Sequence, residues 1–134
     1  MRTDETNYSI VKETKNDEKS YDIWYFVSKV GRERPYKVYV AKASILIEND
    51  RRKSWTKLVF NYEQTDEDGT NYKEVYIYSS VNCSDRTFFY IASRFYNMIG
   101  ELVFSENVST DPEPILADTV SDYVSKFVCA HSEN

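Results

Sequence analysis

The residue types that most often carry catalysis or metal binding are sparse in this sequence. His131 is its one histidine and lies close to the C-terminus, where neither a fixed position nor an orienting partner is assured. Cys83 and Cys129 are 46 positions apart and do not form, with that histidine, a recognisable set of zinc ligands. We therefore expect no catalytic histidine, no bound metal and no cofactor.

An acidic stretch at residues 66–69 (DEDG) superficially resembles a calcium-binding loop. Placing Gly69 at the glycine of such a loop puts Gln64 first and Val75 last, where Asp and a bidentate Glu are required. The stretch therefore predicts a hairpin turn. Glycine-rich phosphate loops, nucleophile elbows and Cys-x-x-Cys pairs do not occur, so we expect a protein that is not an enzyme. A pocket formed by two of the 22 carboxylates stays open as an alternative.

Charge is unevenly distributed along a chain whose formal net charge is −5, which argues against a general nucleic-acid binder. Residues 32–57 carry a net charge of +5, and residues 100–134 carry −6. We predict that a partner contacts the basic segment, with five candidate residues, Arg32, Arg34, Arg51, Arg52 and Lys53. Alternate loops of an antiparallel meander emerge at one end of the sheet, so these cations share an edge unless residues 43–47 form a strand of their own. The alternative is a sheet edge that Arg and Lys merely keep soluble.

The composition predicts the scaffold for these residues. Twelve Tyr, seven Phe and two Trp against three Gly favour a sheet protein over a nucleotide-binding α/β fold. Six short β-rich runs occupy residues 21–29, 35–41, 54–62, 71–80, 87–96 and 100–106. Turn signals stand at Gly31, Asp68-Gly69 and Ser84-Asp85, and no connection is long enough for a crossover helix. We predict an antiparallel meander of about six strands.

Apolar side chains on both faces of several runs require that the sheet be covered. The best helix candidate is the segment from Thr119 to Cys129, where Thr119 can cap the helix with Asp122 three residues later. Its apolar residues recur at helical spacing in one stripe, Val120, Tyr123, Val124 and Phe127. The predicted fold class is α+β, with a single sheet and a C-terminal helix packed on one face.

One domain fits the length of 134 residues. We expect residues 1–20 to be a polar tail, in which the residues around Tyr8–Val11 could form an edge strand, and residues 21–134 to form the domain. Neither a transmembrane stretch nor a signal-peptide core is visible. The chain is therefore either cytoplasmic or the mature part of an exported protein, and two cysteines do not decide between these interpretations.

A series of short motifs is similar to the bacterial surface-adhesin protein E domain family over about residues 21–130. The series begins with WYFV at 24–27, YKVYV at 36–40 leading to Ser44-Ile45, and WTK at 55–57. It continues through Tyr72, the strand that ends at Asn82-Cys83, and FFY at 88–90. It closes with Tyr96, Gly100 and KFVC at 126–129. The order of the motifs and the two cysteine positions carry the resemblance.

The resemblance implies a six-strand antiparallel sheet whose C-terminal helix is tied to it by a disulfide, which would pair Cys83 with Cys129. On an ideal helix Cys129 lies nearly opposite the predicted apolar stripe, so we expect the helix to end or fray by Val128. Members of the family are exported lipoproteins or secreted bacterial proteins, and the best-known ones bind host extracellular-matrix and plasma proteins. This sequence departs from them because it shows no signal peptide and no lipid-modified cysteine.

The combined prediction is a non-catalytic, adhesin-like binding protein of a bacterium that contacts host or other proteins. Its expected location is the cell surface, the periplasm or the medium, with membrane attachment only through a lipid anchor that this chain does not show. Two alternatives stay open. One is a periplasmic structural or inhibitory protein with a bacterial protein partner, and the other is a small-ligand carrier or enzyme, which would need an aromatic-lined pocket.

Overall fold

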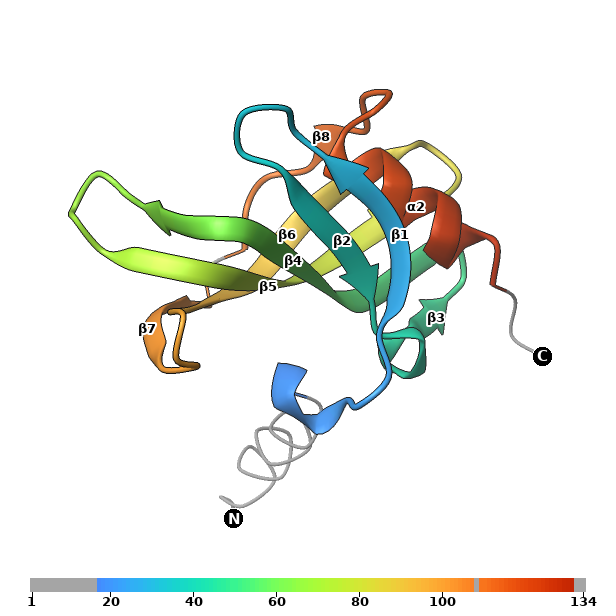
Figure 1. The fold of residues 1–134 in the computed structure, drawn as a ribbon. Coiled ribbons are helices and arrows are strands. Elements are labelled where there is room, and N and C mark those ends of the chain that lie inside the picture. Colours follow the sequence, from blue (N-terminus) through green and yellow to red (C-terminus); the bar gives the residue numbers. More distant parts are fainter. Residues whose placement is uncertain (1–16, 108, 132–134) are drawn as a thin grey trace, which may run out of the picture.

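The computed structural model, which describes residues 17–107 and 109–131, is an antiparallel sheet with one helix on its face (Figure 1). The strands are β1 (Tyr25–Val30), β2 (Tyr36–Val40), β3 (Leu46–Glu48), β4 (Arg51–Thr65), β5 (Asn71–Asn82), β6 (Thr87–Tyr96), β7 (Leu102–Glu106) and β8 (Glu113–Pro114). Six of them neighbour one another in the order β1-β2-β4-β5-β6-β7, while β3 pairs with β4 and β8 with β6. The predicted meander is confirmed, and the two extra strands are too short for an alternating pattern to reveal.

Two of the predicted turns depend on glycine. Gly31, in the β1–β2 loop, has φ +89°, and a Cβ there would lie 2.7 Å from the carbonyl oxygen of Arg34. Gly69, between β4 and β5, has φ +83°. The Asp66 carboxylate accepts two backbone hydrogen bonds within this second turn, each 2.9 Å long. The acidic stretch is therefore a hairpin turn, as predicted.

The helix α2 (Val120–Cys129) begins where the sequence predicted, because the Thr119 hydroxyl accepts a hydrogen bond from the backbone N–H of Asp122 at 3.3 Å. Its buried residues are Asp122, Val124, Ser125 and Val128. The buried face is therefore rotated away from the predicted stripe, and this rotation leaves Cys129 half-buried at its margin. The expectation that the helix ends or frays by Val128 is wrong, since Cys129 is still helical.

The core on the helix side of the sheet consists mainly of β-branched side chains. Its buried members are Val38, Val40, Leu58, Val75, Val81, Val124 and Val128. The helix lies beside β1 and one end of β4, so the far part of this face, toward the β4–β5 hairpin, extends beyond it (Figure 1). None of the helices in the described residues is both long and apolar enough to cross a membrane.

The opposite face of the sheet is covered by the segment that precedes β1. A 3-10 turn, η1 (Glu18–Ser20), is capped by Asp17 and lies beneath the sheet (Figure 1). Glu18 is only 4% exposed, because its carboxylate accepts a hydrogen bond from the Tyr96 hydroxyl and lies 4.0 Å from Nε of Arg94. The end of the predicted polar tail is thus folded onto the domain. The edge strand expected around Tyr8–Val11 lies outside the described residues.

Candidate functional site

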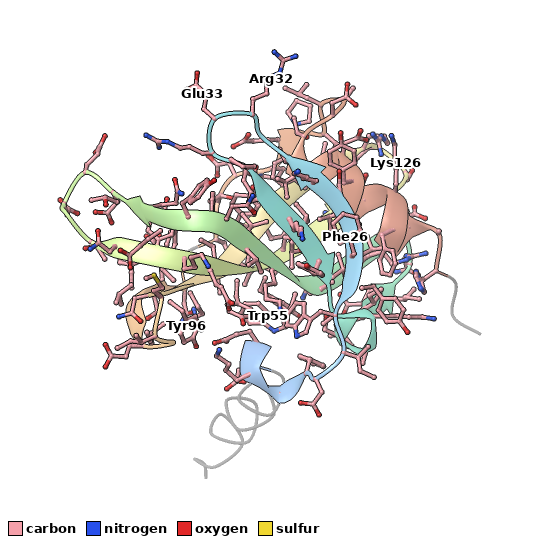
Figure 2. All side chains as sticks on the ribbon, viewed as in Figure 1. Phe26, Arg32, Glu33, Trp55, Tyr96 and Lys126 are labelled. Carbon is pink, nitrogen blue, oxygen red and sulfur yellow. A yellow bond between two sulfur atoms is a disulfide. The ribbon has the colours of Figure 1, made fainter. Side chains whose placement is uncertain are left out.

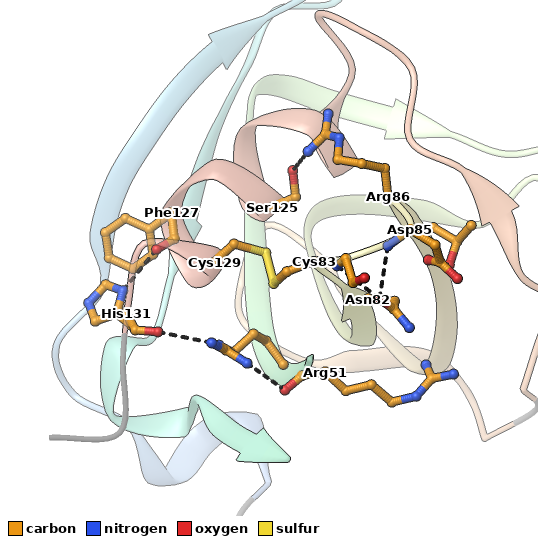
Figure 3. Close-up of a disulfide and its surroundings, with 12 residues drawn as sticks. Arg51, Asn82, Cys83, Asp85, Arg86, Ser125, Phe127, Cys129 and His131 are labelled. Atoms are coloured by element: carbon orange, nitrogen blue, oxygen red, sulfur yellow. Dashed lines mark hydrogen bonds between the residues drawn. A yellow bond between two sulfur atoms is a disulfide. The ribbon is translucent and has the colours of Figure 1, made fainter. Parts of the chain in front are cut away.

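A disulfide joins Cys83, just after β5, to Cys129, the last residue of α2, as the family resemblance implied (Figure 3). The two Cα atoms are 5.8 Å apart, within the usual range for such bonds. Arg52 donates to the carbonyl oxygen of His131 at 3.3 Å on one side of the bond, and Arg86 donates to the Ser125 hydroxyl at 3.0 Å on the other. The bond and these contacts fix the end of the helix on the sheet.

Asp122, the one acidic residue of α2, is buried, with 2% of its surface exposed. Its carboxylate accepts hydrogen bonds from the backbone N–H of Asp118 and from the Arg86 guanidinium, both at 3.0 Å, and lies 3.2 Å from Lys126 Nζ. The Asp118 N–H holds the pKa of Asp122 below its usual value, and the Arg86 guanidinium and Lys126 act in the same direction. The network therefore anchors the start of the helix to the β5–β6 hairpin.

The five predicted contact residues do not come together. Arg32 and Arg34 lie in the β1–β2 loop, where Asn61 of β4 donates to Pro35 at 3.1 Å (Figure 2). Arg51 begins β4, ten positions before Asn61 in the sequence, which corresponds to about 30 Å along a strand. Because β2 pairs directly with β4 and Leu46–Glu48 form a strand beside it, the two loops stand at opposite ends of the sheet. The condition under which the five cations would share one edge is therefore not met.

The three cations at the start of β4 contact their own chain. Arg52 donates to the carbonyl oxygens of Asn49 and Arg51, in addition to that of His131. Lys53 lies 3.8 Å from Glu48, and the Arg51 guanidinium lies 5.8 Å from the ring centre of Phe89. Arg32 and Arg34 are exposed, as is Arg51, whereas Arg52 and Lys53 are half-buried.

Aromatic rings and cations alternate on the face covered by the N-terminal segment. Lys57 lies over the Trp24 ring at 4.8 Å, and Lys19 lies over the Tyr96 ring at 4.0 Å. Burial lowers the pKa of Lys57, and it raises the pKa of Tyr76 and of Tyr96, which also carry hydrogen bonds to glutamates. These groups satisfy one another within the chain, so this face is already occupied.

On the helix side, a row of aromatic rings crosses the sheet in the part beyond α2. The row, from β2 through β4, β5 and β6 to β7, consists of Tyr36, Phe60, Tyr72, Phe95 and Phe104. Successive ring centres are 4.7, 5.8, 4.9 and 5.5 Å apart. Phe104, at the outer end, is 47% exposed. The sequence shows aromatic residues in every run, but only the strand register brings these five into contact.

A groove of about 440 Å³ opens next to this aromatic row. Val30 and Tyr36 line it on one side, and Phe88 and Tyr90 of β6 line it on another. Glu113 and Asp118 supply carboxylates from the segment that leads into α2. Sequence analysis did not find this site, because residues 30–36, 88–90 and 113–121 converge only in the folded sheet.

Metal chemistry finds no support in the part of the chain that the structure describes, where no group of three or more His, Cys, Asp or Glu side chains is arranged to hold an ion. The described surface carries a row of rings, an acidic groove and an exposed arginine loop. The protein is thus a small α+β protein whose helix is tied by a disulfide to an antiparallel sheet. The pattern of the surface-adhesin protein E family matches residues 24–130, and the chain belongs to this family.

Solved structures of protein E from Haemophilus influenzae are similar to this chain. Crystal form II is 14% identical, with a TM-score of 0.53 over 69% of this chain and 80% of that one. Protein E from a non-typeable strain is also 14% identical, with a TM-score of 0.56 over 78% and 75% of the two chains. At such identities the likeness establishes the fold alone. Among curated protein sequences, none matches the chain significantly.

Proposed function

We propose that this chain is a non-catalytic, extracytoplasmic binding protein that holds a protein partner on its aromatic row. Membership of the surface-adhesin family supports an adhesin-like role. The observation that carries the proposal is the position of the five rings, on the part of the helix-side face that extends beyond α2. Large aromatic side chains are enriched in protein interfaces, because they supply much contact area for little conformational entropy.

The disulfide supports the proposed location. Such bonds persist in oxidising compartments, including the periplasm and the extracellular space, and are rare in the cytosol. A host extracellular-matrix or plasma protein is the partner that suits a surface adhesin, and the same row would serve a bacterial protein in the periplasm. Arg32 and Arg34 are proposed as additional contacts, because they are exposed in the loop that leads directly into Tyr36.

The proposal is tested by measuring the binding of the purified chain to a panel of immobilised extracellular-matrix and plasma proteins. Phe104→Ala shortens the row at its exposed end. Phe26→Ala is the matched control, because Phe26 is 56% exposed and contacts one ring, that of Tyr39, on the opposite face. We expect Phe104→Ala to weaken binding by about tenfold and Phe26→Ala to leave it unchanged. Equal effects of the two variants, or no binding to any panel member, would refute the proposed host-directed function.

A further inference from the structure

The groove next to the aromatic row has the composition of a ligand site. Most of its lining residues are apolar or aromatic, and its volume of about 440 Å³ lies in the range of small-ligand pockets. Its charged lining residues, Glu113 and Asp118, are both acidic, and no lysine or arginine lines it among the described residues. Ionised carboxylates only accept hydrogen bonds, so the groove presents acceptors without a charged donor to match.

A second observation concerns a small cavity that borders the groove. Phe88, Tyr90, Val120 and Ser121 line both the groove and a smaller cavity of about 10 Å³ behind it. Thr56 lines that cavity with 2% of its surface exposed, and its hydroxyl oxygen has no hydrogen-bond partner in the described chain. A cavity of this size holds one water-sized group. The groove therefore borders a small cavity that holds a buried hydroxyl without a partner among the described residues.

The electrostatics on the groove's wall agree with this geometry. Burial raises the pKa of the Tyr90 hydroxyl, and the carboxylate of Glu113 and the neighbouring Tyr36 raise it further. Tyr90 and Glu113 both line the groove. Elsewhere in this chain, a lysine ammonium already lies over a tyrosine ring, where Lys19 contacts Tyr96 at 4.0 Å.

We propose that this groove binds the lysine side chain of an extended segment of a protein partner. The four methylene groups would pack between Phe88 and Val120, and the ammonium would donate to Glu113 and Asp118. A long apolar stem with a cationic end matches an apolar trough with acidic groups better than an acidic or neutral ligand does. The inference names the partner chemistry for the proposed binding function, on which it rests.

The test uses a blocked Gly-Lys-Gly-Lys-Gly peptide and the same peptide with ε-acetylated lysines, titrated into the isotope-labelled chain and followed by NMR. We expect only the cationic peptide to shift the amide signals of Tyr90, Val120 and Ser121. Glu113→Gln with Asp118→Asn should weaken its binding by about tenfold. The second substitution preserves the backbone, because Asp118 has φ +64° and Asn tolerates this conformation well. Thr56→Val should leave binding unchanged, because Thr56 lines the bordering cavity and not the groove.

The matched control is Glu67→Gln with Asp68→Asn, which removes the same two charges from the exposed β4–β5 turn. An equal loss of affinity in this control would overturn the proposal in favour of general charge attraction. Binding of the acetylated peptide, or shifts confined to other residues, would overturn it as well. Phe104→Ala should not change peptide binding, so failure of the groove and failure of the aromatic row give different results. A loss of affinity in Thr56→Val would overturn the placement of the ammonium at Glu113 and Asp118.

Discussion

At the scale of single residues, Asp122 has a role that sequence spacing indicates only in part. The sequence places it in the first turn of a helix after the Thr119 cap, and this was confirmed. Its partner Arg86 is 36 positions away, and its buried orientation depends on a rotation of the helix face that periodicity did not give. The cysteine pairing was predictable because the family resemblance supplied it, whereas the groove residues come from three distant segments.

Asp122 makes stability depend on pH in the acid range. Its folded-state pKa lies below the unfolded value, so its contribution is fully present above about pH 4 and is lost as pH falls through the folded-state pKa. We expect the midpoint of urea unfolding to fall more steeply with acid in the wild type than in Asp122→Asn. Parallel curves for the two proteins between pH 5 and pH 2 would show that this carboxyl is not protected by its neighbours.

At the scale of elements, strand positions were predictable because each run ends at turn residues with a distinct conformation. Gly31 and Gly69 both have positive φ, and the six predicted runs overlap the six strands of the main path. The short strands β3 and β8 were not predictable, because two or three residues carry no alternation. The same limit left the position of Arg51–Lys53 open in the sequence, because it depends on which strands pair.

The disulfide is the main covalent restraint on α2. Closing a loop between residues 46 positions apart stabilises the folded state by about 4 kcal/mol in the chain-entropy model. We expect Cys83→Ser with Cys129→Ser to lower the free energy of urea unfolding by about 3–4 kcal/mol. The reduced wild type should unfold at the same urea concentration as the double variant. A loss below about 1 kcal/mol would mean that packing of Val124 and Val128 holds the helix without the bond.

The N-terminal segment is predicted to contribute to stability although most of its side chains are polar. Glu18→Ala leaves the Tyr96 hydroxyl buried without its acceptor, and such a loss costs about 1–3 kcal/mol. Asp22→Ala is the control, because Asp22 is exposed in the same segment. The free energy of urea unfolding is measured for both variants. If the segment were a polar tail that does not pack on the sheet, both variants would be as stable as the wild type.

At the scale of the whole molecule, the two faces of the sheet differ in what covers them. Lys19, Lys57 and Arg94 fill the aromatic face under η1, whereas the row from Tyr36 to Phe104 extends beyond the helix. The basic residues that are close together in the sequence lie at opposite ends of the sheet, Arg32 and Arg34 at one end and Arg51–Lys53 at the other. The proposed function therefore depends on surface that the fold leaves open, which a linear charge pattern does not locate.

The arginine loop should affect the rate at which a partner is captured. Arg32→Glu with Arg34→Glu reverses two exposed charges beside Tyr36, so association should slow and depend differently on salt, while dissociation changes little. Surface plasmon resonance at two salt concentrations measures both rates for the strongest binder of the panel. Lys29→Glu with Lys37→Glu is the control, with two exposed lysines changed on the adjoining strands. An equal effect of both pairs would mean that net charge alone governs capture.

Hydrogen exchange of the chain, free and in complex with its strongest-binding panel protein, tests the central claim most directly. If the partner lies on the aromatic row, amides in β7 and in the β4 and β5 segments around Phe60 and Tyr72 should exchange more slowly in the complex. Amides of residues 17–24, which cover the face of the sheet opposite α2, and amides of β1 should exchange as in the free chain. Protection confined to those residues, with none in β7, would contradict the proposed binding surface.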